Sequence, residues 1–242
     1  MFYYNVENKF FIDWNKIKIN ITSADEFYII NEIFVKQIYN YNTLRDCIVV
    51  DIGMNVGLAS IFFAKNTKVK KVYGFEPFKQ TYQQACYNFS LNEPISNKII
   101  PANFGISQEN KFRDLVYNFE YKGSVGLYGY ASTNTDSAKL KETIELKDVN
   151  SIISLIRKEN PEKYDYIFKI DCEGDEYDII QRLIQDEQLL PNVIMLEWHK
   201  NGPEAIIRDL VKTNFEIFSF YTEDNFYGFL YCIRRNIDKV SI

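Results

Sequence analysis

Two apolar runs that each reach an acidic residue constrain the fold of this chain more than any other feature. Residues 47–52 form a β-branched run that contains Asp51, and residues 71–76 form a second run that ends in Glu76. The loop after the first run has glycine or asparagine at every second position: Gly53, Asn55 and Gly57. Glycine accepts a positive φ and lets a ligand approach the backbone, and asparagine tolerates the same conformation. The pattern predicts a nucleoside-binding crevice at the carboxyl ends of two parallel strands, with Glu76 accepting hydrogen bonds from ribose hydroxyls.

The spacing of this loop excludes the dinucleotide fingerprint. That fingerprint requires G-x-G-x-x-G, whereas the order here is Gly53-x-Asn55-x-Gly57, with Ser60 where the third glycine would fall. The order D-x-G-x-N-x-G is instead similar to motif I of the class I S-adenosylmethionine (SAM) methyltransferases.

Composition limits the class of protein. With 242 residues, 46% of them hydrophobic, the chain can bury one large core. Its net charge of −5 makes nonspecific nucleic-acid binding unexpected, because that binding needs a basic face. Four scattered cysteines without a C-x-x-C pair argue against a zinc site and a disulfide framework. No signal peptide and no apolar run near the roughly 20 residues of a membrane span are visible, so we expect a cytoplasmic protein without a transmembrane segment.

From residue 45 the chain alternates between predicted strands and helices. The strands are apolar along their length, which is typical of parallel strands buried on both faces. They cover residues 47–52, 71–76, 98–103, 165–172 and 192–198, and residues 215–221 and 226–234 add a predicted antiparallel hairpin. We therefore expect an α/β fold over residues 45–242, with a doubly wound, mainly parallel, Rossmann-like sheet of seven strands.

Two regions depart from this alternation. Residues 1–44 predict a small α+β cap, with strands at 10–14 and 17–21 and an amphipathic helix over 27–39. The cap is expected to pack on the core or on a second subunit, which makes it a candidate homodimer interface. Residues 105–150 predict a loop or insertion. It is read either as a mobile loop over a cleft or as a plain surface insertion, with a strand at 142–146 and a helix beginning at 147–149.

Chemically useful side chains follow two further predicted strands. Asp171 and Glu173 lie in the run Lys169 to Gly174, and Glu197 precedes the only histidine of the chain, His199. The carboxyl ends of parallel strands meet at one edge of a sheet. These side chains are therefore predicted to face the nucleoside.

Four segments, in order, resemble the motifs of the FkbM-type SAM-dependent methyltransferases, a family of class I methyltransferases. They are Val50–Gly57, Gly74–Pro77, Lys169–Glu176 and Met195–His199. The resemblance runs from about residue 45 to residue 200 and implies that residues 45–242 form a SAM-binding methyltransferase domain. It also implies SAM as the cofactor and S-adenosylhomocysteine as the product.

The resemblance implies roles for individual residues. The cofactor contacts would be Asp51, Gly53, Asn55, Gly57, Glu76, Ala102, Asn103 and Asp171. The glycine-rich loop would line the methionine end, Glu76 would hold the ribose, and residues 102–103 fall where the adenine is contacted. Asp171 and Glu173 would lie near the amino-acid moiety and the acceptor.

The family also implies O-methylation of a sugar, such as a surface-polysaccharide precursor or a nucleotide-linked sugar. Two alternatives stay open: a small phosphorylated or amide metabolite as acceptor, and a non-catalytic binding subunit with the same fold. Candidate substrate contacts are Glu173, Lys169 and Trp198, with Trp198 either in the core or stacking on a sugar.

A hydroxyl must lose its proton when it is methylated, and His199 is the candidate base. Its unperturbed pKa of about 6.5 suits that role at neutral pH. In this hypothesis Glu197 or Asp171 orients His199 or the substrate, and these three form the candidate catalytic set. The plain alternative is a hydrogen-bonded surface histidine.

The acids of residues 171–176 raise the question of a metal. Carboxylates suit hard cations, but Asp175, which replaces the family's usual alanine, and Glu176 also suit the positive N-terminus of the following helix. Helix capping is the preferred interpretation, and no metal is predicted.

Overall fold

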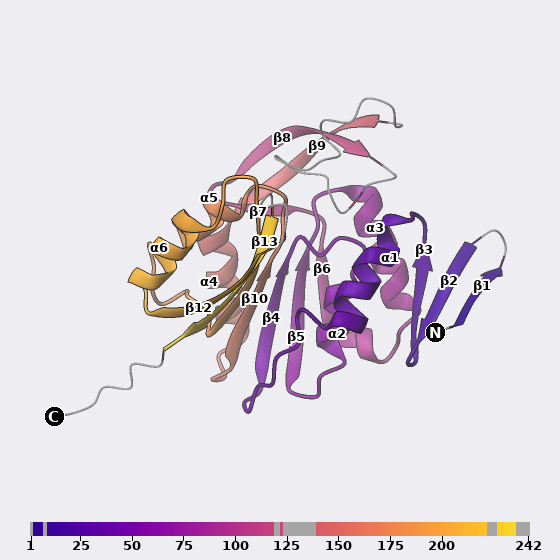
Figure 1. The fold of residues 1–242 in the computed structure, drawn as a ribbon, viewed down its shortest axis with the longest axis horizontal. Coiled ribbons are helices and arrows are strands. Elements are labelled where there is room, and N and C mark those ends of the chain that lie inside the picture. The colour runs from indigo at the N-terminus through magenta and orange to yellow at the C-terminus, as the bar shows by residue number, and fades with distance from the viewer. Residues whose placement is uncertain (1, 7–8, 119–121, 123–138, 222–226, 236–242) are drawn as a thin grey trace.

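A seven-stranded sheet forms the centre of the molecule (Figure 1). The computed structural model describes residues 2–6, 9–118, 122, 139–221 and 227–235. The strands lie in the order β12 (Phe215–Tyr221), β13 (Tyr227–Arg234), β11 (Val193–His199), β10 (Asp165–Ile170), β4 (Cys47–Ile52), β5 (Val69–Phe75) and β6 (Ile99–Ala102). Strands β11, β10, β4, β5 and β6 are parallel, and β13 is antiparallel to both β11 and β12. The predicted fold class, including the antiparallel hairpin, is confirmed.

Helices cover both faces of this sheet because its strands are apolar on both faces. Ile48, Val50 and Ile52 of β4 belong to one core cluster, and Cys47 and Val49 belong to the other. The first cluster also contains α4 (Val149–Glu159), α5 (Glu176–Leu183) and α6 (Glu204–Lys212). The second contains α2 (Leu58–Ala64) and α3 (Lys79–Ser90), and the short helix η2 (Ile95–Lys98) precedes β6. Alternation along buried strands thus produces a helix–sheet–helix sandwich.

The N-terminal residues form a cap on the α3 side of the sandwich (Figure 1). Its antiparallel sheet consists of β1 (Phe2–Val6), β2 (Lys9–Trp14) and β3 (Ile17–Ile21), of which β1 was not predicted. Asn88 of α3 and Asn92, two residues beyond its end, tie the cap to the core, because their side chains accept hydrogen bonds from the backbone of β3.

The predicted cap helix consists of two pieces. These are α1 (Asp25–Ile30) and the π-helix η1 (Asn31–Lys36). Gln37 adopts a left-handed conformation and ends η1 before the predicted boundary at residue 39.

Residues 105–148 contain a second sheet rather than only a loop. Strands β7 (Gly105–Ser107), β9 (Lys139–Asp148) and β8 (Lys111–Asn118) lie in that order, and Figure 1 shows β8 and β9 above the central sheet. The prediction of a loop is therefore wrong for residues 111–118, whose backbone pairs with β9 along the whole strand. The predicted strand at 142–146 lies inside β9, and α4 begins at Val149 as expected. The glycine-rich residues 123–135 lie outside the described residues.

The described part of the chain contains neither a membrane-spanning helix nor a disulfide bond. None of its helices combines the length and apolar character that crossing a bilayer requires. All four cysteines are free, and Cys47 and Cys232 are buried.

Candidate active site

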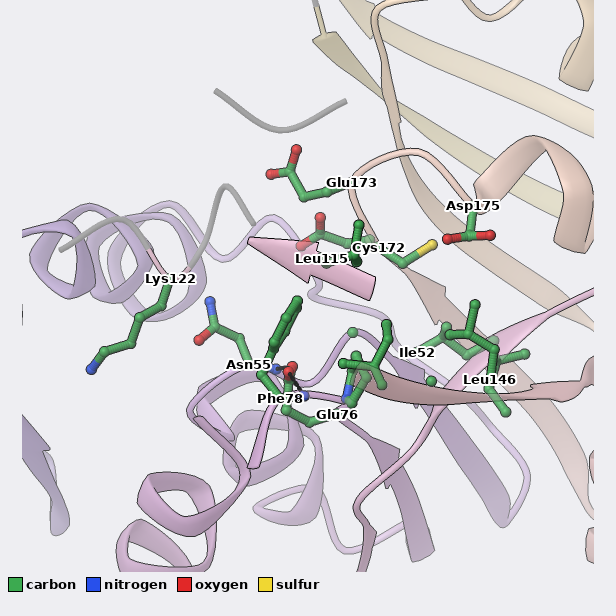
Figure 2. A pocket seen from close by; sticks show the side chains of 16 residues that line it. Ile52, Asn55, Glu76, Phe78, Leu115, Lys122, Leu146, Cys172, Glu173 and Asp175 are labelled. Atoms are coloured by element: carbon green, nitrogen blue, oxygen red, sulfur yellow. Dashed lines mark hydrogen bonds between the residues drawn. The ribbon is translucent and has the colours of Figure 1, made fainter. Parts of the chain in front are cut away.

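A cavity opens at the carboxyl ends of β4, β5 and β10, beneath β8 and β9. It contains about 640 Å³ of empty space, open solvent at its mouth included. Figure 2 shows Asn55 and Glu76 toward one side of this cavity and Glu173 toward the other. We call the loop Gly53–Gly57 with Glu76 the glycine-loop half. The acidic half consists of Asp171 and Glu173, which line the cavity, and of Glu197 and His199 beside them.

Backbone geometry shapes the glycine-loop half. Gly53 has a φ of +75°, and a Cβ there would lie 1.8 Å from the carbonyl oxygen of Asp171. Asn55 adopts a φ of +51°, as the sequence predicts for a residue that tolerates this region. Gly57 lies behind the loop, and its Cβ would meet the ring of Phe89 at 2.4 Å. Gly53 and Asn55 line the cavity, whereas Gly57 allows α3 to approach the loop.

Glu76 lies at the floor of the glycine-loop half with a fixed carboxylate. It accepts hydrogen bonds from the backbone N–H groups of Asn55 and Phe78 at 3.1 and 3.0 Å. Burial raises its pKa to about 7, although these two hydrogen bonds pull in the opposite direction. A carboxylate has about four acceptor positions, so Glu76 retains capacity to accept from a ligand hydroxyl.

Ala102 and Asn103 support Glu76 from behind. The carbonyl of Ala102 accepts from the N–H of Glu76, and the amide of Asn103 donates to the carbonyls of Glu76 and Pro77 at 2.9 and 3.0 Å. These contacts hold the turn after β5 in place. A direct contact of either residue with a cofactor stays a prediction.

Lys169 connects the two halves beneath the cavity. Its ammonium lies 3.3 Å from a carboxylate oxygen of Asp51 and 3.4 Å from one of Asp171. Burial alone lowers the pKa of Lys169, but the two carboxylates outweigh burial and raise it. Asp51 is completely buried and also accepts from the hydroxyl of Ser60 at 2.6 Å. Lys169 and Asp51 thus hold each other, and only Asp171 of the three lines the cavity.

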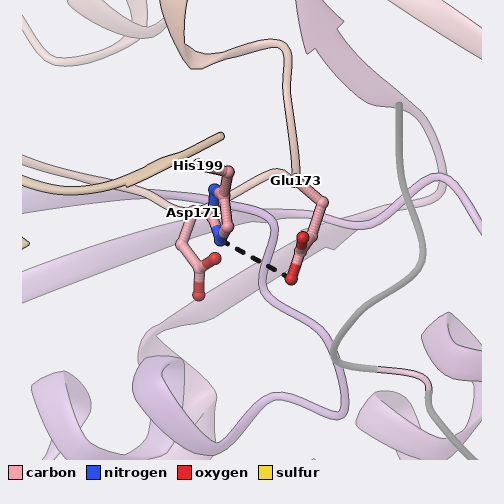
Figure 3. Close-up of side chains that lie close together, drawn as sticks. All are labelled: Asp171, Glu173 and His199. Carbon is pink, nitrogen blue, oxygen red and sulfur yellow. Dashed lines mark ion pairs between the residues drawn. The ribbon is translucent and has the colours of Figure 1, made fainter. Parts of the chain in front are cut away.

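His199 forms the centre of the acidic half. Its Nδ1 lies 3.1 Å from the carboxylate of Glu176, and its Nε2 lies 3.6 Å from Glu173 and 3.8 Å from Glu197. Figure 3 shows the ring of His199 between Asp171 and Glu173. The structure brings the three candidate catalytic side chains together at one end of the sheet.

The charges of this half change the protonation expected of His199. Burial lowers its pKa, but the hydrogen bond to Glu176 and the charges of Glu173 and Asp171 raise it to about 10. Burial raises the pKa of Glu173 to about 8 and that of Glu197 well above its usual range. The pKa of about 6.5 assumed from sequence is therefore wrong for this environment, and His199 by itself carries a proton at neutral pH.

Trp198 lies in the core instead of the cavity. Its side chain is 2% exposed and lies against Gly228, where a Cβ would come within 2.7 Å of the indole ring. The strand alternation that directs Glu197 toward the site turns Trp198 to the opposite face. Trp198 therefore presents no face on which a sugar could stack.

Asp175 and Glu176 lie at the N-terminus of α5, at the N-cap and in the first turn, as the sequence interpretation expected, but Asp175 makes no cap hydrogen bond with its side chain. Asp175 accepts hydrogen bonds from both terminal nitrogens of Arg113, at 2.5 and 3.0 Å, and from Ser107. This joins the second sheet to the loop after β10. Glu176 is fully buried and orients His199. Sequence reasoning missed Arg113 and Ser107, and the one available signal was the acid at position 175.

Lys122 is a further cavity residue that sequence reasoning missed. Its ammonium lies 2.9 Å from a carboxylate oxygen of Glu26 in the cap, and both side chains are buried. The insertion therefore contacts the cap at the rim of the cavity.

Comparison with known proteins identifies the family. The model of the FkbM methyltransferase domain matches residues 51–222, which include both halves of the cavity. This chain belongs to the FkbM methyltransferase family. Within the family the methyl donor is SAM, so the chain is a methyltransferase with SAM as its cofactor.

Individual relatives agree with this assignment. A methyltransferase of Sordaria araneosa, sdnD, is 23% identical over 79% of this chain and 82% of its own length. Methyltransferase 1 of Beauveria bassiana is 24% identical over 77% of this chain and 79% of its own length.

A solved structure supports the fold. The FkbM methyltransferase of Methylobacillus flagellatus superposes with a TM-score of 0.52 at 14% identity. The match covers 79% of this chain and 44% of that longer chain.

The cavity fits this cofactor by its donor set. Glu76, Gly53 and Asp171 line it: a carboxylate that could accept from ribose hydroxyls, a backbone open to close approach, and a second carboxylate that could face the ammonium and sulfonium groups.

Proposed function

We propose that this methyltransferase transfers the methyl group of SAM to a hydroxyl of a sugar. The observation that carries the proposal is the position of Asp171, Glu197 and His199 beside the cavity that Glu76 and the glycine loop line. Carboxylates accept hydrogen bonds from several hydroxyls at once, which suits a polyhydroxylated acceptor.

The charge of the acidic half disfavours a phosphorylated group at the point of transfer. Among the described residues, the cations at the cavity are already paired: Lys122 with Glu26, and Lys169 with Asp51 and Asp171. An anionic acceptor would therefore face carboxylates without a free cation. A nucleotide-linked sugar fits only with its diphosphate directed away from the acidic half.

The protein forms no covalent bond to the substrate in this reaction. SAM supplies an activated methyl group: the acceptor oxygen forms a bond to the methyl carbon, the carbon–sulfur bond breaks with its electron pair going to sulfur, and the hydroxyl proton leaves. The chain has to hold the acceptor oxygen in line, exclude water and take that proton. The candidate proton acceptors are His199, once it has lost its own proton, and the carboxylates of Glu197 and Asp171.

A direct test combines binding and turnover. Calorimetric titration with S-adenosylhomocysteine should show one site per chain, and Glu76→Gln should weaken it. Labelled SAM incubated with surface-polysaccharide precursors, nucleotide sugars and small amide or phosphorylated metabolites should label a sugar hydroxyl. Binding of the cofactor with labelling of an amide or phosphorylated metabolite alone would replace the sugar assignment. Absence of cofactor binding would favour the non-catalytic alternative.

A further inference from the structure

Three residues of the acidic half place ligand atoms around one point. One ligand atom each from Asp171, Glu173 and His199 lies within 4.8 Å of the other two (Figure 3). We propose that these residues bind a divalent metal cation of the Mn²⁺ type, which in turn holds the acceptor hydroxyl. The part played by the acceptor rests on the proposed function, whereas the metal site rests on the geometry alone.

The ring of His199 is oriented as a metal ligand requires. Nδ1 faces Glu176, whose carboxylate also accepts from the backbone N–H groups of His199 and Gly174 at 2.9 and 2.7 Å. Histidines that bind metals usually donate their other ring nitrogen to such a carboxylate. Because Nδ1 is occupied, Nε2 is the nitrogen that faces Glu173.

Nε2 has no hydrogen bond within the part of the chain that the structure describes. The residue is 8% exposed, and the carboxylate oxygens nearest to Nε2 lie at 3.6 and 3.8 Å, in Glu173 and Glu197. Hydrogen bonds between charged groups are shorter, about 2.7–2.9 Å. Ligands about 2.0–2.2 Å from a metal are separated from one another by roughly 3–4 Å. The ring and the carboxylate are therefore at ion-pair distance, too far apart for a hydrogen bond, and at a separation that lets both bind one cation.

The carboxyl groups around this point supply oxygen ligands for a cation. Asp171, Glu173 and Glu197 converge on it, and Lys169 is shared with Asp51 below the cavity. Two carboxylates and one imidazole form a mixed set of oxygen and nitrogen ligands. Such a set suits Mn²⁺ better than it suits Ca²⁺, which takes oxygen ligands only.

A bound cation would also act on the acceptor hydroxyl. Metal binding displaces the proton from Nε2 into solvent, because a ligating imidazole is neutral. The cation then lowers the pKa of the acceptor hydroxyl that it binds. That proton passes to Glu197, the oxygen keeps its electron pair for the bond to the methyl carbon, and His199 is no longer needed as the base.

Mn²⁺ binding to the full chain tests the proposal without any acceptor. Protein freed of metal with a chelator should bind one Mn²⁺ per chain, measured by electron paramagnetic resonance titration. Glu173→Gln and His199→Asn should each weaken binding at least about 10-fold. Glu109→Gln is the matched control, since this side chain is 63% exposed and lies outside the site, and it should bind like the natural chain. A ¹⁴N coupling to Mn²⁺ in pulsed spectra should be present in Glu109→Gln and absent in His199→Asn.

The outcomes separate this proposal from the proposed function. Equal Mn²⁺ affinity in Glu173→Gln and the natural chain, or no ¹⁴N coupling, would overturn the metal site even if the chain binds S-adenosylhomocysteine. One Mn²⁺ per chain with the expected losses would support the site even if every sugar acceptor fails. Thermal unfolding of each variant checks that it is folded, and Glu173→Asp, which keeps the charge, should retain more affinity than Glu173→Gln.

Discussion

The two halves of the cavity are built on opposite principles. In the glycine-loop half, backbone groups satisfy the one acid: Glu76 accepts from two N–H groups, and the loop residues have defined conformations. In the acidic half, side chains face side chains, and the contacts of His199 Nε2 with Glu173 and Glu197 exceed hydrogen-bond distance. The first half is therefore preorganised for a ligand, whereas in the second a bound cation or acceptor would balance charges that the side chains leave without close hydrogen bonds.

The largest effect should come from the acidic half. His199→Asn is expected to reduce turnover about 10²–10⁴-fold, whether the ring takes a proton or holds a metal. Affinity for S-adenosylhomocysteine should stay within about 3-fold, because none of the contacts of Glu76 involves His199. Single-turnover rates and calorimetry measure the two effects. An equal loss of affinity would mean that the halves do not act separately.

Gly53→Ala should break the junction between the halves. The new Cβ would meet the backbone of Asp171 at 1.8 Å with φ at +75°, so we expect a loss of about 3 kcal/mol or more in the free energy of unfolding. Gly202→Ala is the matched control: φ is +74°, but its Cβ would meet only the flexible end of Glu204. That variant should lose about 1 kcal/mol. Similar losses in denaturant titrations would remove the argument for close packing at Gly53.

Cofactor affinity should depend on pH through Glu76. In the proposed site the ionised carboxylate would accept hydrogen bonds from ribose hydroxyls, and burial raises its pKa to about 7. Affinity for S-adenosylhomocysteine should therefore rise as pH increases through about 7 and fall below it, by roughly 10-fold between the two forms. Glu76→Gln should bind about 10-fold more weakly at pH 8 and lose this pH dependence. Calorimetry from pH 6 to 8 measures both, and an unchanged pH profile in the variant would assign the titration to another group.

The smallest effect should come from the support behind Glu76. Asn103→Ala removes donors to the carbonyls of Glu76 and Pro77, which should cost about 1 kcal/mol of stability and less than about 5-fold in cofactor affinity. A larger loss of affinity at unchanged stability would show that Asn103 contacts the adenine directly.

Local patterns predicted much of the fold and of the glycine-loop half. Apolar runs that continue through both faces, such as residues 47–52, predict buried parallel strands in any context. Asn55 and Gly53 predict a left-handed loop because few residues tolerate positive φ. The strand β8 was missed because its exposed Phe112 and charged neighbours have no apolar face comparable with those of the central strands.

Long-range contacts decided the rest. Asp175 suits a helix N-terminus in sequence, but Arg113, which lies 62 residues away along the chain, binds it. The sequence shows that Trp198 has an aromatic ring that could stack on a sugar. Strand alternation, however, directs this ring into the core.

By itself, the sequence predicted the parallel strands along the chain and the acids at their carboxyl ends, because these follow from residue types at fixed spacing. Its motifs also resembled the family that the comparison then identified. Only the tertiary structure decided which charges meet. The pKa of His199 near 10, the partnership of Lys169 with Asp51, and the ligand geometry of Asp171, Glu173 and His199 all depend on distances between separate strands. Electrostatic energy varies with those distances and with burial. Neither quantity can be predicted from the spacing of residues along the chain.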